Sequence, residues 1–151
     1  MLAQLDALAG VWDMAATIGG QDLSGAWSTF EWIEDGAFLR LRADAELPAD
    51  VPEELRANAP FPVTVIIGLD DSSERFGYLY ADGRGVHRVY EMTLEGSEWS
   101  IWGQSGPEFF QRFFGTFSDD QNTIDARWEF SPDGETWELD FELTYRRRSS
   151  R

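Results

Sequence analysis

One arginine of this 151-residue chain lies in a strongly apolar pattern, which makes it the residue best suited to hold a ligand. Arg88 alternates with Val86, Tyr90 and Met92, and residues two apart in a strand point to the same face. An unpaired charge on a buried face is costly, so the guanidinium must meet an anion there. Arginine offers a fork of donors to a carboxylate, and Tyr90 adds a hydroxyl. The pattern therefore predicts the polar end of a pocket for an anionic group.

Four further side chains are expected to complete this pocket. Gln111 shares a face with Phe109 and Phe113 and would add an amide contact, and Tyr78 would add a hydroxyl. Trp128 and Tyr145, on apolar faces of later segments, would line an aromatic wall. Such pockets are mostly apolar with a few placed polar groups. Aromatic residues at period two also form ordinary core, so both interpretations of these two residues stay open.

Arg88 has an alternative partner within the protein. An internal carboxylate such as Asp13, which shares a segment with Trp12, would neutralise it without any ligand. The side chain would otherwise extend to the mouth of the fold, where water solvates it. On either of these interpretations Arg88 is structural.

The sequence also allows an enzyme in which tyrosine, arginine and a carboxylate perform acid-base or isomerase chemistry. That hypothesis requires a buried carboxylate with a shifted pKa, with Glu91 and Asp13 as candidates. His87 is the single histidine, and alternation places it on the outward face of its segment, away from a catalytic role. We expect no catalytic residue, no metal and no cofactor, and the acidic turns lack the ligand spacing of a calcium loop.

The charge balance excludes several classes of partner. The chain has 12 basic residues against 28 acidic ones, a net charge of −16. Such a surface repels phosphate backbones and anionic lipid headgroups, so we expect neither nucleic acid nor membrane as partner. Cysteine is absent, which excludes disulfides and thiolate chemistry. The first residues lack the features of a secretory signal, so a cytoplasmic location is expected.

Turn residues recur about every ten residues, the spacing of an antiparallel meander. Between them we predict ten strands, at 11–19, 24–33, 37–47, 61–69, 75–81, 85–94, 97–103, 109–118, 122–130 and 136–146. Short helices are expected at Met1 to Leu8 and Asp50 to Asn58. In the last strand, Trp137, Leu139 and Tyr145 are predicted to share the buried face.

Ten strands without long intervening helices predict an all-β fold. Closure into a single antiparallel up-and-down barrel removes exposed sheet edges. A barrel of this size should contain a cavity unless aromatic side chains fill it. We expect one barrel domain at 1–147 and a basic tail at 148–151.

Two groups of motifs resemble known families. The opening Gly10-Val11-Trp12 is similar to that of the calycins, the lipocalins and fatty-acid-binding proteins. That resemblance implies that the tryptophan closes one barrel end beneath an arginine of the last strand, here Arg146 or Arg147. Residues 84–146, with Arg84-Gly85-Val86-His87-Arg88 and Gln111-Arg112-Phe113, resemble the lipocalin-like DUF1579 family. At Gly103 that family often has a basic residue. It has no established activity, so the resemblance bears on fold.

The leading hypothesis is non-catalytic binding of a small amphipathic anion inside the barrel. The enzyme is the second hypothesis. The third is a filled barrel that acts through its surface as a homodimer or accessory protein. If Phe110 and Phe114 point outward, they would form an apolar patch for such a contact or lie under a loop.

Overall fold

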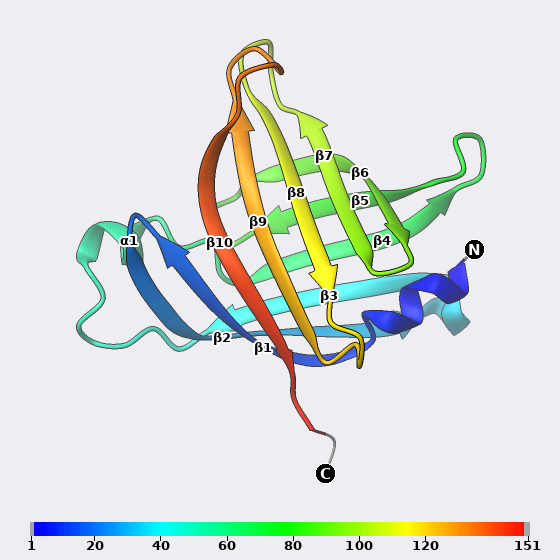
Figure 1. Ribbon diagram of the computed structural model, residues 1–151, viewed down its shortest axis with the longest axis horizontal. Coiled ribbons are helices and arrows are strands. Elements are labelled where there is room, and N and C mark those ends of the chain that lie inside the picture. Colours follow the sequence, from blue (N-terminus) through cyan, green and yellow to red (C-terminus); the bar gives the residue numbers. More distant parts are fainter. Residues whose placement is uncertain (1, 150–151) are drawn as a thin grey trace.

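The protein forms a closed barrel of ten antiparallel strands, described here from a computed structural model for residues 2–149 (Figure 1). The strands are β1 (Gly10–Ile18), β2 (Gln21–Ile33), β3 (Phe38–Ala45), β4 (Val63–Asp70), β5 (Arg75–Asp82), β6 (His87–Glu95), β7 (Glu98–Gln104), β8 (Phe110–Phe117), β9 (Thr123–Ser131) and β10 (Glu138–Arg147). All ten predicted strands are present, with ends that differ by a few residues. The predicted all-β barrel is confirmed.

Each strand pairs with its neighbours in sequence, and β1 pairs with β10 to close the ring. Short turns allow this order. Between β1 and β2, Gly19 and Gly20 have φ of 58° and 81°, a left-handed conformation that glycine adopts without steric cost. Closure pairs Trp12 with Arg147. The start of β1 and the end of β10 therefore lie side by side at one end of the barrel.

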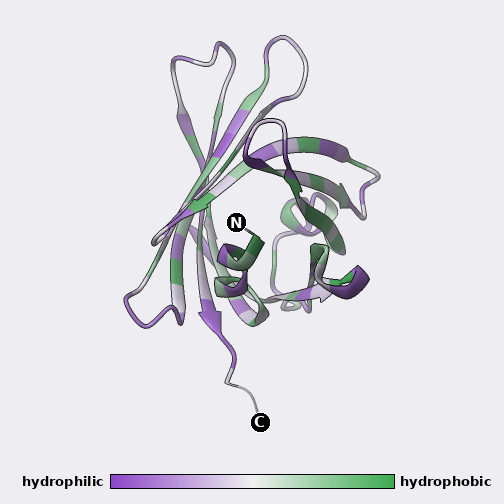
Figure 2. Cartoon of the chain, turned by 90° about the vertical axis from the view of Figure 1, so that its right-hand side faces the viewer, coloured by the Kyte–Doolittle hydropathy of each residue, from purple (hydrophilic) through white to green (hydrophobic). Residues whose placement is uncertain are grey.

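A short helix closes that end of the barrel. The helix η1 (Leu2–Ala7) lies within the ring of strands when the molecule is viewed from this side (Figure 2). Leu5 and Leu8 are fully buried, and the indole N–H of Trp12 donates to the Leu8 carbonyl at 2.8 Å. The helix expected at Met1 to Leu8 is confirmed over its described part, since Met1 lies outside the described residues. We call this the closed end.

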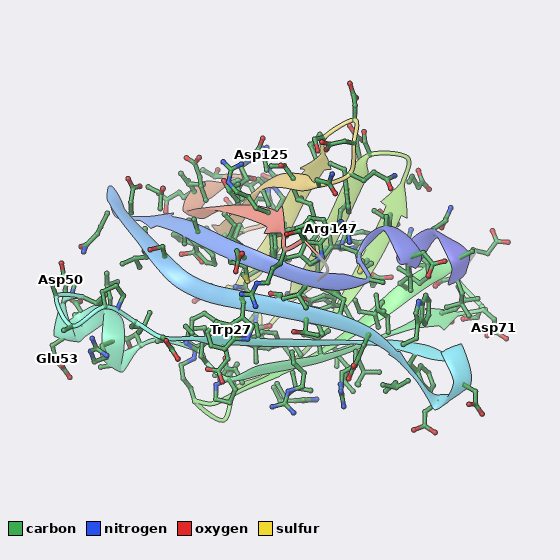
Figure 3. The ribbon with its side chains drawn as sticks, turned by 90° about the horizontal axis from the view of Figure 1, so that it is seen from below. Trp27, Asp50, Glu53, Asp71, Asp125 and Arg147 are labelled. Carbon is green, nitrogen blue, oxygen red and sulfur yellow. The ribbon has the colours of Figure 1, made fainter. Side chains whose placement is uncertain are left out.

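Arg147 joins the last strand to this plug (Figure 3). Its guanidinium lies 4.2 Å from the Trp12 ring centroid and donates to the carbonyls of Ala9 and Ala7 at 2.6 and 2.7 Å. Arg146 is exposed. Of the two arginines expected to cover the tryptophan, Arg147 is the one that does so.

The longest connection, between β3 and β4, lies at the other end of the barrel (Figure 1). It contains α1 (Glu53–Ala57), within the predicted segment 50–58. Its end contacts the β5–β6 turn, where the Gly83 N–H donates to the Pro60 carbonyl at 2.9 Å. We call this the open end. No helix in the described chain has the length and apolar character needed to cross a bilayer.

Two parts of the predicted core are wrong. A bulge in β10 lies between Leu139 and Phe141, so Leu139 is 52% exposed rather than buried. The extra residue of a bulge reverses which face the following side chains occupy. Trp137, just before the strand, lies outside the barrel with its ring 3.9 Å from the Arg112 guanidinium carbon. The side chains of β10 that point into the barrel therefore begin at Phe141.

The faces of β8 were undecided in the sequence and are fixed by the structure. Phe113 and Phe117 are buried inside, and Phe110 and Phe114 point outward. Gly134 of the β9–β10 connection lies against the Phe110 ring, and Arg112 and Arg127 lie over Phe114. Both outward rings are therefore covered. They do not form the open apolar patch on which the homodimer hypothesis depended, and the homodimer stays a prediction.

The expected basic tail is only partly visible. Arg148 remains beside β1, with its N–H bonded to the Val11 carbonyl at 2.8 Å. Ser150 and Arg151 lie outside the described residues. The acidic side chains labelled in Figure 3 are exposed: Asp50 and Glu53 in the β3–β4 connection, Asp71 in the β4–β5 turn and Asp125 on β9.

Candidate functional site

Arg88, Tyr90 and Gln111 meet inside the open half of the barrel. Arg88 and Tyr90 are two residues apart on β6 and so share the inward face. Gln111 lies on β8, with β7 between the two strands. The Gln111 side-chain oxygen accepts from Arg88 Nη1 at 3.0 Å and from the Tyr90 hydroxyl at 2.6 Å. The structure thus brings together three of the six candidate residues through direct hydrogen bonds.

Gly103 makes this contact across β7 sterically feasible. It pairs with Gln111 in the β7–β8 register, and a Cβ at this position would lie 2.8 Å from Cδ1 of Tyr90. The absence of a side chain lets the Tyr90 ring lie over β7 and reach Gln111. In the sequence this glycine was only a departure from the DUF1579 pattern. Its role depends on the register of β6, β7 and β8, which cannot be read from the sequence around Gly103.

The three side chains leave a surplus of donors. Arginine has no acceptor, so the Gln111 amide must direct its oxygen at Arg88 and its NH₂ group away. The Tyr90 proton is already used in its bond to the same oxygen. The remaining donors of the cluster are N–H groups of Arg88 and Gln111. A group that binds here must supply acceptors.

Arg88 has no carboxylate partner among residues 2–149. The predicted alternative, Asp13, is wrong, because Asp13 is exposed and binds Arg148 at 2.5 Å outside the barrel. Arg88 is half-buried, bonds to the neutral amide of Gln111 and lies 5.3 Å from the Phe109 ring centroid. A neutral amide and a ring compensate a cation less than a carboxylate does. Among residues 2–149 the Arg88 guanidinium thus has no anionic partner, and its exposed part is left to solvent.

The other candidate residues extend the site inward through stacked rings. Tyr78 lies 5.9 Å and Trp128 5.7 Å from Tyr90 between ring centroids. Tyr145 lies deeper, 5.9 Å from Trp99. Burial raises the pKa of Tyr90, and the hydrogen bond with Arg88 lowers it in part. These phenols are therefore neutral at physiological pH.

The interior is filled at the closed end and accessible to solvent toward the open end. On β4, Ile67 and Val65 are fully buried, whereas Val63 near the mouth is 7% exposed. On β3, Leu39 is fully buried and Leu41 is 6% exposed. Inward side chains nearer the mouth, including Tyr80, Trp128, Phe141, Ala16 and Ala126, are half-buried. Aromatic rings thus fill the closed end, and the exposure of the inward side chains increases from the middle of the barrel to the open end.

A second polar group, which the sequence reasoning missed, lies at the rim. The Asp82 carboxylate accepts from the Tyr80 hydroxyl at 2.6 Å and from Arg84 Nη2 at 2.8 Å, and its side chain is fully buried. Burial alone raises the pKa of Asp82, but the bonds from Arg84 and Tyr80 outweigh it and lower the pKa to about 2. Asp82 is therefore ionised and paired within its own turn. The sequence feature that could have indicated this group is the turn Asp82-Gly83-Arg84-Gly85, which places an acidic and a basic residue two apart.

The carboxylates named for the enzyme hypothesis are not inside the barrel. Glu91 is exposed on the outer face, where it binds Arg75 at 3.0 Å and accepts from the Trp102 indole. Asp13 is exposed as well. His87 points outward and is exposed, as predicted. Within residues 2–149, no group of three or more acidic or histidine side chains could hold a metal ion.

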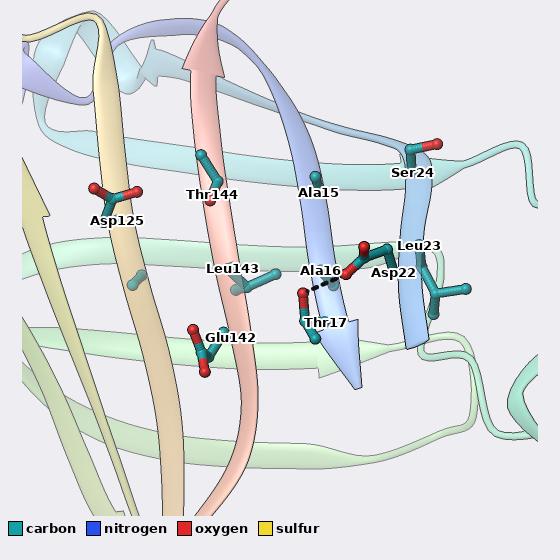
Figure 4. Close-up of a pocket in the computed structure, with 11 residues that line it drawn as sticks. Ala15, Ala16, Thr17, Asp22, Leu23, Ser24, Asp125, Glu142, Leu143 and Thr144 are labelled. Carbon is teal, nitrogen blue, oxygen red and sulfur yellow. Dashed lines mark hydrogen bonds between the residues drawn. The ribbon is translucent and has the colours of Figure 1, made fainter. Parts of the chain in front are cut away.

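Two open pockets of about 430 Å³ each lie on the outer wall, and none of the six candidate residues lines either of them. The first is bordered by outward side chains of β1, β2, β9 and β10, among them Thr17, Asp125 and Glu142 (Figure 4). Asp22 bonds Thr17 across its edge at 2.9 Å. The first groove has three acidic side chains and no arginine in its lining, so it is a poor match to an anion. The second contains Arg146 and Arg148 beside Asp13 and Glu46, and Arg148 is already paired with Asp13.

Comparisons with known proteins give little beyond the fold described above. No family model matches the chain, and no curated protein matches it. One solved structure that is similar in part is a protein of unknown function from the DUF3598 family of Nostoc punctiforme PCC 73102. It is 10% identical, with a TM-score of 0.31 over 97% of this chain and 98% of that one. At this level of similarity the comparison carries no argument about function, and the resemblance to the DUF1579 family stays a prediction.

Proposed function

We propose that the protein binds a small amphipathic anion in the open half of its barrel, without catalysis. A carboxylate fits the site best, because the guanidinium of Arg88 and the NH₂ group of Gln111 are both donors of one hydrogen-bonded cluster. The apolar body would lie against Tyr78, Trp128 and Tyr145. The observation that carries this proposal is the half-buried Arg88, whose bonded partner is a neutral amide.

The test is a titration of decanoate and of uncharged decanol into three proteins. These are the wild type, Arg88→Met, and Arg42→Met as a matched control on the exposed outer face of β3. Tryptophan fluorescence reports binding, since Trp128 lies beside Tyr90. A charged hydrogen bond contributes about 1.5–3 kcal/mol, so Arg88→Met should weaken decanoate binding roughly 10- to 150-fold. Decanol should bind all three proteins alike.

Equal decanoate affinity in the wild type and Arg88→Met would remove Arg88 from the role. An aromatic carboxylate, 2-naphthoate, is titrated into the wild type as a second anionic probe. If 2-naphthoate and decanoate both fail to bind the wild type, the proposal itself is wrong. Near-ultraviolet circular dichroism of each variant checks that the aromatic core is intact, so that a loss of binding is not a loss of fold.

We also propose that the barrel is of the calycin type. Support comes from the closed end, where Arg147 covers Trp12 and bonds two carbonyls of the N-terminal segment. This arrangement matches what the Gly-x-Trp opening implies. The calycin proposal concerns the fold and the end of the barrel through which a ligand would enter. It does not identify the ligand.

A further inference from the structure

Two tyrosines deep in the barrel have hydroxyl groups without an acceptor in the described chain. Tyr78 and Tyr145 are each 6% exposed, and neither hydroxyl donates to any group of residues 2–149, whereas the two tyrosines nearer the mouth are both satisfied. Tyr80 donates to Asp82 and Tyr90 to Gln111, each at 2.6 Å. Fully enclosed hydroxyls are nearly always bonded. Neither of these two oxygens is among the fully enclosed unpaired atoms of residues 2–149, so both border space inside the barrel that solvent can reach.

The two hydroxyls lie on opposite walls of the same interior. In the ring of strands, four strands separate β5 from β10 on either side, so Tyr78 and Tyr145 face one another across the barrel. Burial first, and then the electrostatic influence of Tyr145, raise the pKa of Tyr78. Burial raises the pKa of Tyr145. Both groups therefore stay neutral donors.

A third donor lies next to this pair. The indole N–H of Trp99 is buried and has no acceptor in the described chain, and the Trp99 ring centroid is 5.9 Å from that of Tyr145. The surrounding groups are apolar or aromatic, such as Phe113 at 4.7 Å from Trp99. The middle of the barrel thus contains three donor groups, of Tyr78, Tyr145 and Trp99, that no group of residues 2–149 accepts from.

We propose that Tyr78 and Tyr145 form a second polar subsite, which donates hydrogen bonds to an uncharged oxygen at the far end of the ligand. This inference rests on the proposed function, in which Arg88 and Gln111 hold the anionic end. No guanidinium of the described chain bonds to either phenol, so the subsite suits a carbonyl or hydroxyl oxygen better than a second anion. The ligand class is then an oxo or hydroxy carboxylic acid rather than a simple fatty acid.

The register sets the scale of such a ligand. Tyr78 pairs with Tyr90 between β5 and β6, and Tyr90 is two residues from Arg88, which is about 7 Å along a strand. A short chain is enough to connect the two polar ends. Hexanoate and octanoate, with their methyl-ketone counterparts 5-oxohexanoate and 7-oxooctanoate, are suitable probes.

Isothermal titration of these acids into the wild type provides the first test. A neutral hydrogen bond predicts that an oxo acid binds roughly 3- to 10-fold more tightly than its parent. The double variant Tyr78→Phe/Tyr145→Phe keeps both rings and should lose this preference, with parent-acid affinity within about twofold of the wild type. Tyr80→Phe is the matched control, because its hydroxyl already binds Asp82, and it should retain the preference.

The two proposals fail in different ways. If the wild type binds parent and oxo acids equally, and Arg88→Met weakens both, the second subsite is wrong while the anion site stands. The same conclusion follows if the double variant keeps the preference. If the wild type binds none of the acids, the anion site fails and the subsite with it. The wild-type comparison needs no variant, so a folding defect in the double variant leaves the inference testable.

Discussion

Gly103→Ala tests how the site is assembled. The added Cβ would lie 2.8 Å from Cδ1 of Tyr90 and 3.3 Å from the Val89 carbonyl oxygen. Neither atom is the free end of a flexible side chain, so the Tyr90 ring must move away from Gln111. Overpacking of this kind costs about 1–3 kcal/mol. Loss of the bond from the Tyr90 hydroxyl costs about 0.5–1.5 kcal/mol more. We expect a decrease of about 2–4 kcal/mol in the free energy of unfolding.

Urea denaturation followed by tryptophan fluorescence measures this change. The matched control is Gly77→Ala on β5, where a Cβ meets no atom within 4 Å and φ is not in the left-handed region. That substitution should change stability by less than about 0.5 kcal/mol. The cause is isolated by a double-mutant cycle with Tyr90→Ala, because removal of the ring removes the clash.

A result within about 0.5 kcal/mol of wild type for Gly103→Ala would refute the reasoning. So would additive effects of Gly103→Ala and Tyr90→Ala, since the predicted cost comes from contact between these two positions. Decanoate affinity gives an independent reading of the same geometry. It should fall in Gly103→Ala and stay unchanged in Gly77→Ala.

Two further predictions concern the plug and the buried phenols. Arg147→Met removes the contacts of the guanidinium with the Trp12 ring and with two backbone carbonyls. It should lower the free energy of unfolding by about 3 kcal/mol, whereas exposed Arg146→Met should lower it by less than about 0.5 kcal/mol. Equal effects of the two substitutions in urea denaturation would contradict the assigned plug. Burial raises the pKa of all four tyrosines above the usual 10.0, so their stabilising effect is complete below pH 10 and is lost above it. In a spectrophotometric pH titration, tyrosinate absorbance should stay low through pH 10 and rise only as the protein unfolds, and a normal titration of the native protein at pH 10 would refute the burial argument.

The sequence by itself determined the strands and the faces of most of them. Alternation with a period of two placed Arg88 and Tyr90 on one inward face and His87 outside, because side-chain direction in a strand follows from local geometry. Turn residues with a regular spacing predicted an up-and-down order. The contact of Trp12 with an arginine of the last strand was implied by the resemblance of Gly10-Val11-Trp12 to the calycin opening, which left Arg146 and Arg147 open.

Only the tertiary structure decided which groups meet. Gln111 reaches Tyr90 because β7 lies between them and carries Gly103 at that level, a relation among three strands that no single segment encodes. The bulge in β10 overturned the alternation at Leu139, because one extra residue exchanges the two faces. Asp13 binds Arg148 outside the barrel rather than Arg88 inside it. Pairing between distant side chains depends on register and closure, which are properties of the whole ring.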